Sequence, residues 1–200
     1  MYKAIIFDLG KVVFDLSFDR VFQSWATASG KSFDEIKNKF TFDNLFDQFE
    51  RNEVTATQFR NTVSQRLNFQ LSDEEFDACW CNLYLDIYPG IDDLLINLKQ
   101  HYKLVALTNT NYIHDKVWRK KYAGTLTHFE KIYASHDMGT RKPEAQAYQL
   151  VLDYLGCDAR ETIFLDDNKN NVAGAKQLGI ETILVTSFEQ LKQELWKHGL

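Results

Sequence analysis

Three short apolar runs stand out along the chain because each one ends in polar side chains. Continuous apolar runs of this length, bounded by turn signals, predict buried strands. In an open parallel sheet, ligands bind at the carboxyl ends of the strands. The runs are residues 4–7, followed by Asp8; residues 104–107, followed by Thr108 and Asn109; and residues 162–165, followed by Asp166 and Asp167.

Strands and amphipathic helices alternate over the second half of the chain. Pro143 and Gly156 bound one of the helical patterns, since proline suits the first turn of a helix and glycine its end. Such alternation implies right-handed crossovers, so we expect an α/β fold with a Rossmann-like parallel sheet. Strands are predicted at 103–108, 131–135, 162–166 and 180–185, and helices at 91–100, 112–122, 143–155, 170–177 and from 187 onward.

Residues 15–88 interrupt this alternation with a block of helical patterns. Three capping boxes are predicted there, at Ser32, Thr55 and Ser72, since each is followed three residues later by Glu or Gln. The block is too regular for a loop, and we interpret it as an inserted all-helical cap domain. The predicted domains are a Rossmann-like catalytic core at 1–14 and 89–200, and the helical cap at 15–88.

Composition and charge argue against several classes of function. The net charge is −5 at pH 7 and no basic stripe is present, so we expect no nucleic-acid partner. No apolar run approaches the roughly 20 residues of a membrane span, and the amino terminus enters a strand without a signal-peptide pattern. The three cysteines show no disulfide or metal spacing. We therefore expect a cytoplasmic protein without a membrane partner, either a monomer or a weak homodimer.

Three aspartates converge if the three apolar runs are neighbouring strands. Asp8, Asp166 and Asp167 would then meet at one point, where carboxylates repel each other unless a cation lies among them. Mg²⁺ prefers carboxylate, carbonyl and water oxygens as ligands, so the pattern predicts a Mg²⁺ site. Taken singly, each aspartate could equally form a turn or cap a helix, but capping alone does not require two adjacent acids.

Other polar groups suit an anionic substrate at the same place. Gly10 lets the backbone approach a ligand closely, so its carbonyl could face the metal. Lys142 precedes Pro143, which favours an extended backbone, and its ammonium would offset part of the negative charge. Thr108 and Asn109 offer a hydroxyl, an amide and backbone N–H groups for oxyanion contacts. In isolation, these residues also have ordinary interpretations as turn residues and a solvent-facing lysine.

Four short motifs occur in order along the chain: FDLG at 7–10, LTNTN at 107–111, RKPEAQAY at 141–148 and FLDDNKNN at 164–171. Their order and residues resemble the four motifs of the haloacid dehalogenase-like (HAD) hydrolases, and the likeness covers nearly the whole chain. Within that superfamily the chain resembles small bacterial sugar-phosphate phosphatases, such as an α-D-glucose-1-phosphate phosphatase. These share the stretch that is here Asn109-Thr110-Asn111, His114 and Trp118.

The resemblance implies a mechanism and roles for the site residues. Asp8 would be the nucleophile that becomes an aspartyl-phosphate, and Lys142 would stabilise both Asp8 and the phosphate. Thr108 and Asn109 would hold the transferring phosphoryl group of a small phosphorylated metabolite, in particular a sugar phosphate. The implied metal ligands are Asp8, the Gly10 carbonyl, Asp167 and, as a weaker candidate, Asp166.

One position departs from the family pattern. Most phosphatases of the superfamily carry a second aspartate two residues after the nucleophile, as general acid and base, and this chain has Gly10 there. General acid–base help is worth about 10²–10⁴-fold in rate. Asp15, His114 or a metal-bound water are the substitutes that the sequence offers. Specificity is expected in the cap, where the polar stretch at 50–53, with Arg51, is a candidate substrate contact.

Two other functions stay open at this point. A 2-haloacid dehalogenase would use the same aspartate to attack carbon, would need no metal, and would not need the acidic pair at 166–167. A non-catalytic phosphate-binding regulatory module is the second, because the usual second aspartate is missing.

Overall fold

Five parallel strands form the central sheet, in the order β5-β4-β1-β6-β7. The computed structural model describes all residues from 1 to 200. Strand β1 pairs with both β4 and β6, with Phe7 opposite Ala106 on one side and Leu165 on the other. The residues that follow β1, β4 and β6 therefore lie at one edge of the sheet. The strands are β1 Ala4–Phe7, β4 Lys103–Thr108, β5 Lys131–Ala134, β6 Thr162–Asp166 and β7 Glu181–Leu184.

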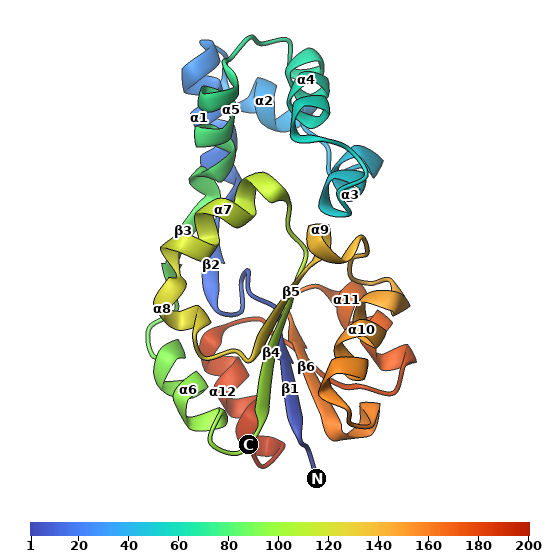
Figure 1. Ribbon diagram of the computed structural model, residues 1–200. Coiled ribbons are helices and arrows are strands. Elements are labelled where there is room, and N and C mark those ends of the chain that lie inside the picture. Colours follow the sequence, from blue (N-terminus) through green and yellow to red (C-terminus); the bar gives the residue numbers. More distant parts are fainter.

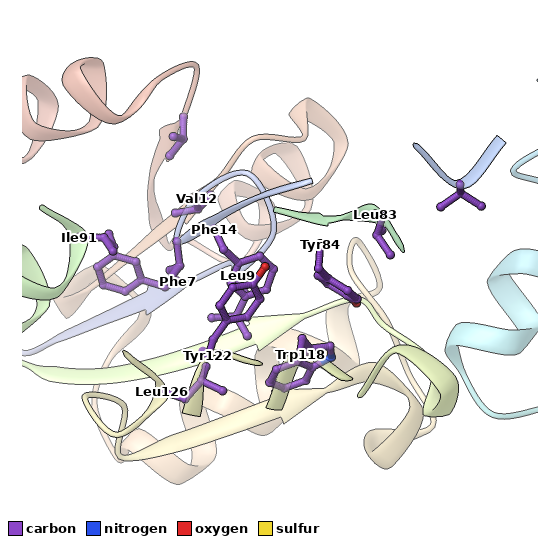
Figure 2. Close-up of a cluster of buried hydrophobic side chains, with 14 of the residues drawn as sticks. Phe7, Leu9, Val12, Phe14, Leu83, Tyr84, Ile91, Trp118, Tyr122 and Leu126 are labelled. Carbon is purple, nitrogen blue, oxygen red and sulfur yellow. The ribbon is translucent and has the colours of Figure 1, made fainter. Parts of the chain in front are cut away.

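Helices cover both faces of this sheet (Figure 1). Alternate side chains of β1 enter two separate hydrophobic clusters, Ile5 and Phe7 in one, Ala4 and Ile6 in the other. Figure 2 shows the first cluster around Phe7, where it extends through Leu9 and Phe14 toward Tyr84. The helices of this part are α6 Ile91–Leu98, α7 Tyr112–Lys121, α8 Ala123–Leu126, α9 Ser135–Met138, α10 Ala145–Leu155, α11 Lys169–Gln177 and α12 Phe188–Lys197, with a 3₁₀ turn at Ala159–Glu161. A second 3₁₀ turn, Cys81–Leu83, lies where the chain leaves the inserted helices.

The remaining helices are inserted after β1 and lie beyond the carboxyl ends of the strands (Figure 1). Two short antiparallel strands, β2 and β3, carry the chain into and out of this helical cap. The α/β fold with an inserted helical cap that the sequence predicts is thus confirmed. The elements are β2 Phe14–Leu16, α1 Phe18–Ser29, α2 Phe33–Lys39, α3 Asn44–Glu50, α4 Ala56–Leu67, α5 Asp73–Trp80 and β3 Tyr84–Ile87.

Aromatic packing holds the cap together. The rings of Trp25 and Trp80 are stacked and parallel, with centroids 5.3 Å apart, and both side chains are fully buried. The predicted capping boxes at Thr55 and Ser72 are confirmed with both reciprocal hydrogen bonds. The box predicted at Ser32 is only half formed, because the Glu35 carboxylate pairs with lysines instead of the Ser32 backbone.

Some boundaries differ from the expectation. Helix α10 begins at Ala145 and not at Pro143. Strands β2 and β3 were not expected, because runs of three and four half-buried residues carry no clear period. The domain limits of 1–14 with 89–200 and of 15–88 fall within or next to these two strands, and they stay a prediction. None of the helices is both long and apolar enough to cross a membrane.

Candidate active site

The predicted site residues meet at the carboxyl edge of the sheet. Asp8 directly follows β1, Thr108 ends β4, and Asp166 ends β6. The backbone N–H of Asp8 donates to the oxygen of Leu165 at 2.8 Å, which continues the strand pairing up to the site. Lys142 reaches the same point from the loop before α10. Strand register therefore brings together residues that are far apart in the sequence.

Lys142 lies between two of the carboxylates. Its Nζ atom is 2.8 Å from Oδ1 of Asp8 and 2.7 Å from Oδ2 of Asp166. The lysine is buried, and burial alone would lower its pKa, but Asp166 and Asp8 outweigh that effect and raise the pKa above its ordinary value. Lys142 is therefore a fixed ammonium at neutral pH.

The Asp8 carboxyl is nearly enclosed, and only one of its oxygens is occupied. Oδ1 accepts from Lys142 and from the backbone N–H of Leu9, whereas Oδ2 has no hydrogen-bond partner in the protein. Burial raises the pKa of Asp8, and so do Asp166 and Asp167, while Lys142 opposes them. A further positive charge beside Asp8 would favour its ionised form.

Asp166 and Asp167 are adjacent but differ in their surroundings. Asp166 is fully buried, and its two oxygens accept hydrogen bonds from Lys142, the backbone of Asn168 and the side chain of Asn171. Asp167 is exposed, and its carboxylate forms no hydrogen bond or ion pair with another side chain. Asp166 therefore fixes Lys142, and Asp167 is the member of the pair with free oxygens. This difference accords with the weaker standing of Asp166 as a predicted metal ligand.

The donor set fits a hard divalent cation. Asp8, Asp166 and Asp167 each offer a carboxylate oxygen, and these atoms lie within 4.8 Å of one another. The single ammonium of Lys142 leaves the group with a net charge of −2 when all three acids are ionised. The carbonyl oxygen of Gly10, at the same edge, accepts no hydrogen bond. Oxygen ligands and excess negative charge are what Mg²⁺ requires.

Thr108 and Asn109 differ in what they leave free. The Thr108 hydroxyl makes no hydrogen bond within the protein and lines the cleft described below. The Asn109 amide bonds twice to Lys142, accepting from its backbone N–H and donating to its carbonyl, each at 2.9 Å. Asn109 thus positions Lys142, and its own side chain has little capacity left for a ligand.

A cleft of about 630 Å³ opens between the sheet edge and the cap. Its floor contains the acidic site and its roof comes from α1, α3 and the segment between α2 and α3. The lining is partly aromatic and partly charged. The cap and hinge residues that face it are Phe14, Leu16, Phe18, Phe42, Phe46, Asp47, Glu50, Leu83 and Tyr84.

Ion pairs join the cap to the core beside this cleft. Arg141 contacts two carboxylates of α3, with Nε 2.7 Å from Glu50 and NH1 2.8 Å from Asp47. In a second contact the cation belongs to the cap and the carboxylate to the core: Arg51 lies 2.8 Å from Glu144. Arg51 does not line the cleft, so the interpretation of Arg51 as a substrate contact is not supported.

The two side chains that the sequence offered as a substitute acid are both engaged elsewhere. Asp15 is paired with Lys11 at 2.6 Å and does not line the cleft. His114 lines the cleft, but its Nε2 donates to the oxygen of Trp80 and its Nδ1 accepts from Asn111. Burial lowers the pKa of His114 to about 3, so that its ring is neutral.

Sequence reasoning missed several members of the site. Asn171 and Arg141 lie inside the recognised motifs but were given no role. No sequence motif singles out Asp47, because its contact with Arg141 arises only from the way α3 folds. Glu50 lies in the polar stretch that was proposed as a contact, and its position at the end of α3 sets it apart from its neighbours.

Comparisons with known proteins agree with this arrangement. A sequence model of haloacid dehalogenase-like hydrolases matches residues 2–179. The D-ribitol-5-phosphate phosphatase of Bacteroides thetaiotaomicron is 24% identical over 200 residues, which cover 98% of this chain and 97% of that protein. The sesquiterpene phosphatase astK of Aspergillus oryzae is 29% identical over 189 residues, covering 92% and 90%.

Solved structures resemble this one over most of their length. A HAD family enzyme of Bacteroides thetaiotaomicron, in complex with magnesium and inorganic phosphate, gives a TM-score of 0.81 at 33% identity, covering 94% of this chain and 96% of that one. The L-2-haloacid dehalogenase of Xanthobacter autotrophicus gives 0.69 at 22% identity, covering 98% and 83%. The second likeness is one of fold alone.

Proposed function

The chain belongs to the haloacid dehalogenase-like hydrolase family. We propose that it is a Mg²⁺-dependent phosphatase of small phosphorylated metabolites, and that its cleft takes a sugar phosphate. The observation that carries this proposal is the position of Lys142 between Asp8 and Asp166, with the free carboxylate of Asp167 alongside. A buried ammonium and a metal-binding carboxylate set at one strand edge form a site for a doubly charged anion.

In the proposed mechanism Asp8 is the nucleophile. Its carboxylate attacks phosphorus, and the bond between phosphorus and the leaving oxygen breaks, which gives an aspartyl-phosphate and an alcohol. Lys142 holds Asp8 in place and balances the charge of the phosphoryl oxygens, and the Thr108 hydroxyl donates to one of them. Water then attacks the aspartyl-phosphate, which releases phosphate and restores Asp8.

The metal is assigned to residues of this chain in the same way. Asp8, Asp167 and the Gly10 carbonyl would hold Mg²⁺, with Asp166 in a supporting role through Lys142 and Asn171. When bound, Mg²⁺ supplies positive charge against the transferring phosphoryl group. The solved structure of a similar HAD family enzyme in complex with magnesium and inorganic phosphate supports the choice of Mg²⁺ as the metal.

The cleft supports a substrate of sugar-phosphate size. Pockets that hold small ligands have volumes of about 300–1,000 Å³. The cleft of about 630 Å³ falls within that range. Its aromatic side chains can pack on the carbon skeleton of a polyol, and its carboxylates can accept hydrogen bonds from hydroxyl groups. The similarity to a D-ribitol-5-phosphate phosphatase points to the same class of substrate.

The remaining expectations from the sequence belong to the same proposal. The helical segment at 15–88 acts as a domain that closes over the leaving group. A cytoplasmic location, and a monomer or weak homodimer without nucleic-acid partners, stay predictions.

A panel of phosphorylated sugars and polyols, assayed for phosphate release with and without Mg²⁺, tests the proposal. We expect Mg²⁺-dependent release from at least one sugar or polyol phosphate, and none after EDTA treatment. Release of halide from 2-haloacids that survives EDTA would instead indicate a dehalogenase. Tight binding of a phosphate analogue with no turnover of any substrate would indicate a regulatory module.

A further inference from the structure

The core of the site has no group to protonate the leaving oxygen. Gly10 occupies the position of the usual second aspartate, Asp15 is tied to Lys11 outside the cleft, and His114 is neutral with both ring nitrogens engaged. An alkoxide is a poor leaving group, so its departure calls for a proton donor. Apart from a metal-bound water, the donor must therefore come from elsewhere in the lining of the cleft.

Glu50 is the buried acid of the cap that faces this cleft. Its side chain is only 6% exposed, and a single protein group, Arg141 Nε at 2.7 Å, bonds to its carboxyl through Oε2. Oε1 has no hydrogen-bond partner in the protein. A buried carboxyl that lines a ligand cleft and keeps one oxygen without a protein partner can exchange a proton with what the cleft holds.

Two consecutive residues link Glu50 to the nucleophile. Arg141 bonds to Glu50 of α3, and Lys142, the next residue, bonds to Asp8. Both Asp8 and Glu50 line the cleft. A phosphate ester bound in this cleft with its phosphorus at Asp8 has a carboxyl of α3 in the lining around it.

We propose that Glu50, carried on the cap helix α3, is the general acid that protonates the leaving oxygen, in place of the aspartate that Gly10 replaces. This inference rests on the proposed phosphatase function. As Asp8 bonds to phosphorus, the ester P–O bond breaks and its electron pair stays on the leaving oxygen, which takes the proton from Glu50 Oε1. Glu50 is then a carboxylate beside Arg141 and can accept a proton from the water that attacks the aspartyl-phosphate. The cycle returns both groups to their starting state.

The charges around Glu50 suit this role. The pKa of Glu50 is raised to about 7, because burial and, to a smaller extent, Asp47 raise it more than Arg141 and Lys142 lower it. A general acid works best with a pKa near the operating pH. The two cations also stabilise the carboxylate that remains after the proton has left.

The substitution Glu50→Gln tests the assignment with two substrates. The amide keeps the shape and can accept from Arg141, but it cannot donate a proton to an alkoxide. For the sugar or polyol phosphate that the wild type hydrolyses best, kcat should fall by about 10²-fold or more. For p-nitrophenyl phosphate, whose leaving group is stable as an anion, the loss should be less than about 5-fold, since it needs little general acid catalysis.

Asp47→Asn is the matched control. Asp47 is the other carboxylate of α3 that pairs with Arg141, at 2.8 Å, but it is more exposed, with 39% of its side chain accessible. This variant weakens the same contact between cap and core and leaves Glu50 in place. Its kcat for the sugar phosphate should fall by less than about 5-fold, far less than in Glu50→Gln, because a carboxyl that can donate a proton is still present at position 50.

The pH profile gives a second readout. In the wild type, kcat for the sugar phosphate should decline above about pH 7, because Glu50 must be protonated to act. This decline should be absent in Glu50→Gln and absent for p-nitrophenyl phosphate in the wild type. Circular dichroism and urea unfolding of each variant establish that it is folded.

The outcomes separate the inference from the function on which it rests. Equal losses for both substrates in folded Glu50→Gln, or an unchanged sugar-phosphate rate, would overturn the assignment of Glu50 while the phosphatase function stands. A wild-type protein that releases phosphate from neither substrate would overturn the proposed function itself.

Discussion

His114 Nε2 lies 3.1 Å from the backbone oxygen of Trp80, and this hydrogen bond joins the first turn of α7 to the last residue of α5. The two rings are also stacked, with centroids 4.5 Å apart. Because a carbonyl oxygen can only accept, Nε2 carries the proton, and Nδ1 accepts from Asn111. A neutral histidine thus lies at the joint between core and cap.

This arrangement makes the stability of the protein depend on pH. Burial lowers the pKa of His114 from 6.5 to about 3, so between these values the unfolded chain binds a proton that the native state does not. The contribution of His114 to stability is complete above about pH 6.5 and is lost as the pH falls, at up to about 1.4 kcal/mol per pH unit. Urea unfolding at pH 7.5 and pH 5 should show this loss.

Two variants make that test specific. His114→Gln should show a shallower decrease in the free energy of unfolding between pH 7.5 and pH 5 than the wild type. His101→Gln, at an exposed histidine, should retain the wild-type slope. Equal slopes for His114→Gln and the wild type would mean that His114 becomes protonated in the folded protein.

Asp8→Asn should abolish phosphate release and leave the protein folded. The amide keeps the size of the side chain but cannot act as the nucleophile. We expect less than about 1% of the wild-type kcat, since covalent catalysis is lost entirely. A folded, cleanly purified variant that retains more than a few per cent of turnover would contradict the covalent mechanism.

Asp167→Ala and Asp166→Asn should fail in different ways. Asp167 has free oxygens, so its loss should raise the Mg²⁺ concentration needed for half-maximal activity, or remove activity at any concentration. Asp166 holds Lys142 and Asn171, so its replacement should lower kcat and the free energy of unfolding together. Breaking one partner of a buried ion pair costs about 3–5 kcal/mol. Identical Mg²⁺ titrations for the wild type and Asp167→Ala would refute the assignment of Asp167 as a metal ligand.

The sequence was sufficient for the core of the fold, because its strands are continuous apolar runs. The apolar run that contains Ile5 and Phe7 predicts β1 from its composition alone. The polar residues that follow each run mark the ligand-binding edge of a parallel sheet. Strands β2 and β3 could not be predicted, because they are short and only half buried. These two strands pair residues that are about 70 positions apart in the sequence. No local pattern in the sequence indicates such a pairing.

The site residues also differ in whether local sequence or tertiary packing positions them. Asp8 and Asp167 could be assigned because strand ends and motifs place them directly. Glu50 could not be singled out from the polar stretch around it, since its burial follows from how α3 packs above Arg141. The same packing leaves Arg51 outside the cleft and paired with Glu144. Residues positioned by tertiary packing are the ones that a single sequence does not identify.

The last prediction concerns Gly10 and the residue that fills the space beside it. A Cβ atom at position 10 would lie 2.6 Å from Cδ1 of Leu16, although the backbone of Gly10 is not left-handed. Because this Cδ1 atom is the end of a half-buried side chain that can move, Gly10→Asp should lower the free energy of unfolding by no more than about 1 kcal/mol through overpacking. The cost should be smaller when Leu16→Ala is introduced as well, because the methyl group that obstructs the new side chain is then absent.

The same pair of substitutions tests where the missing proton donor belongs. In a Glu50→Gln background, Gly10→Asp with Leu16→Ala should recover at least about 10-fold in kcat for the sugar phosphate, within the range of general acid catalysis. Gly10→Asn with Leu16→Ala is the control, since it has the same shape without a transferable proton. Recovery by aspartate alone would mean that the strand edge and the cap helix offer two positions for one acid. Equal recovery by asparagine would show that the added side chain acts through packing, and it would remove proton donation from the explanation.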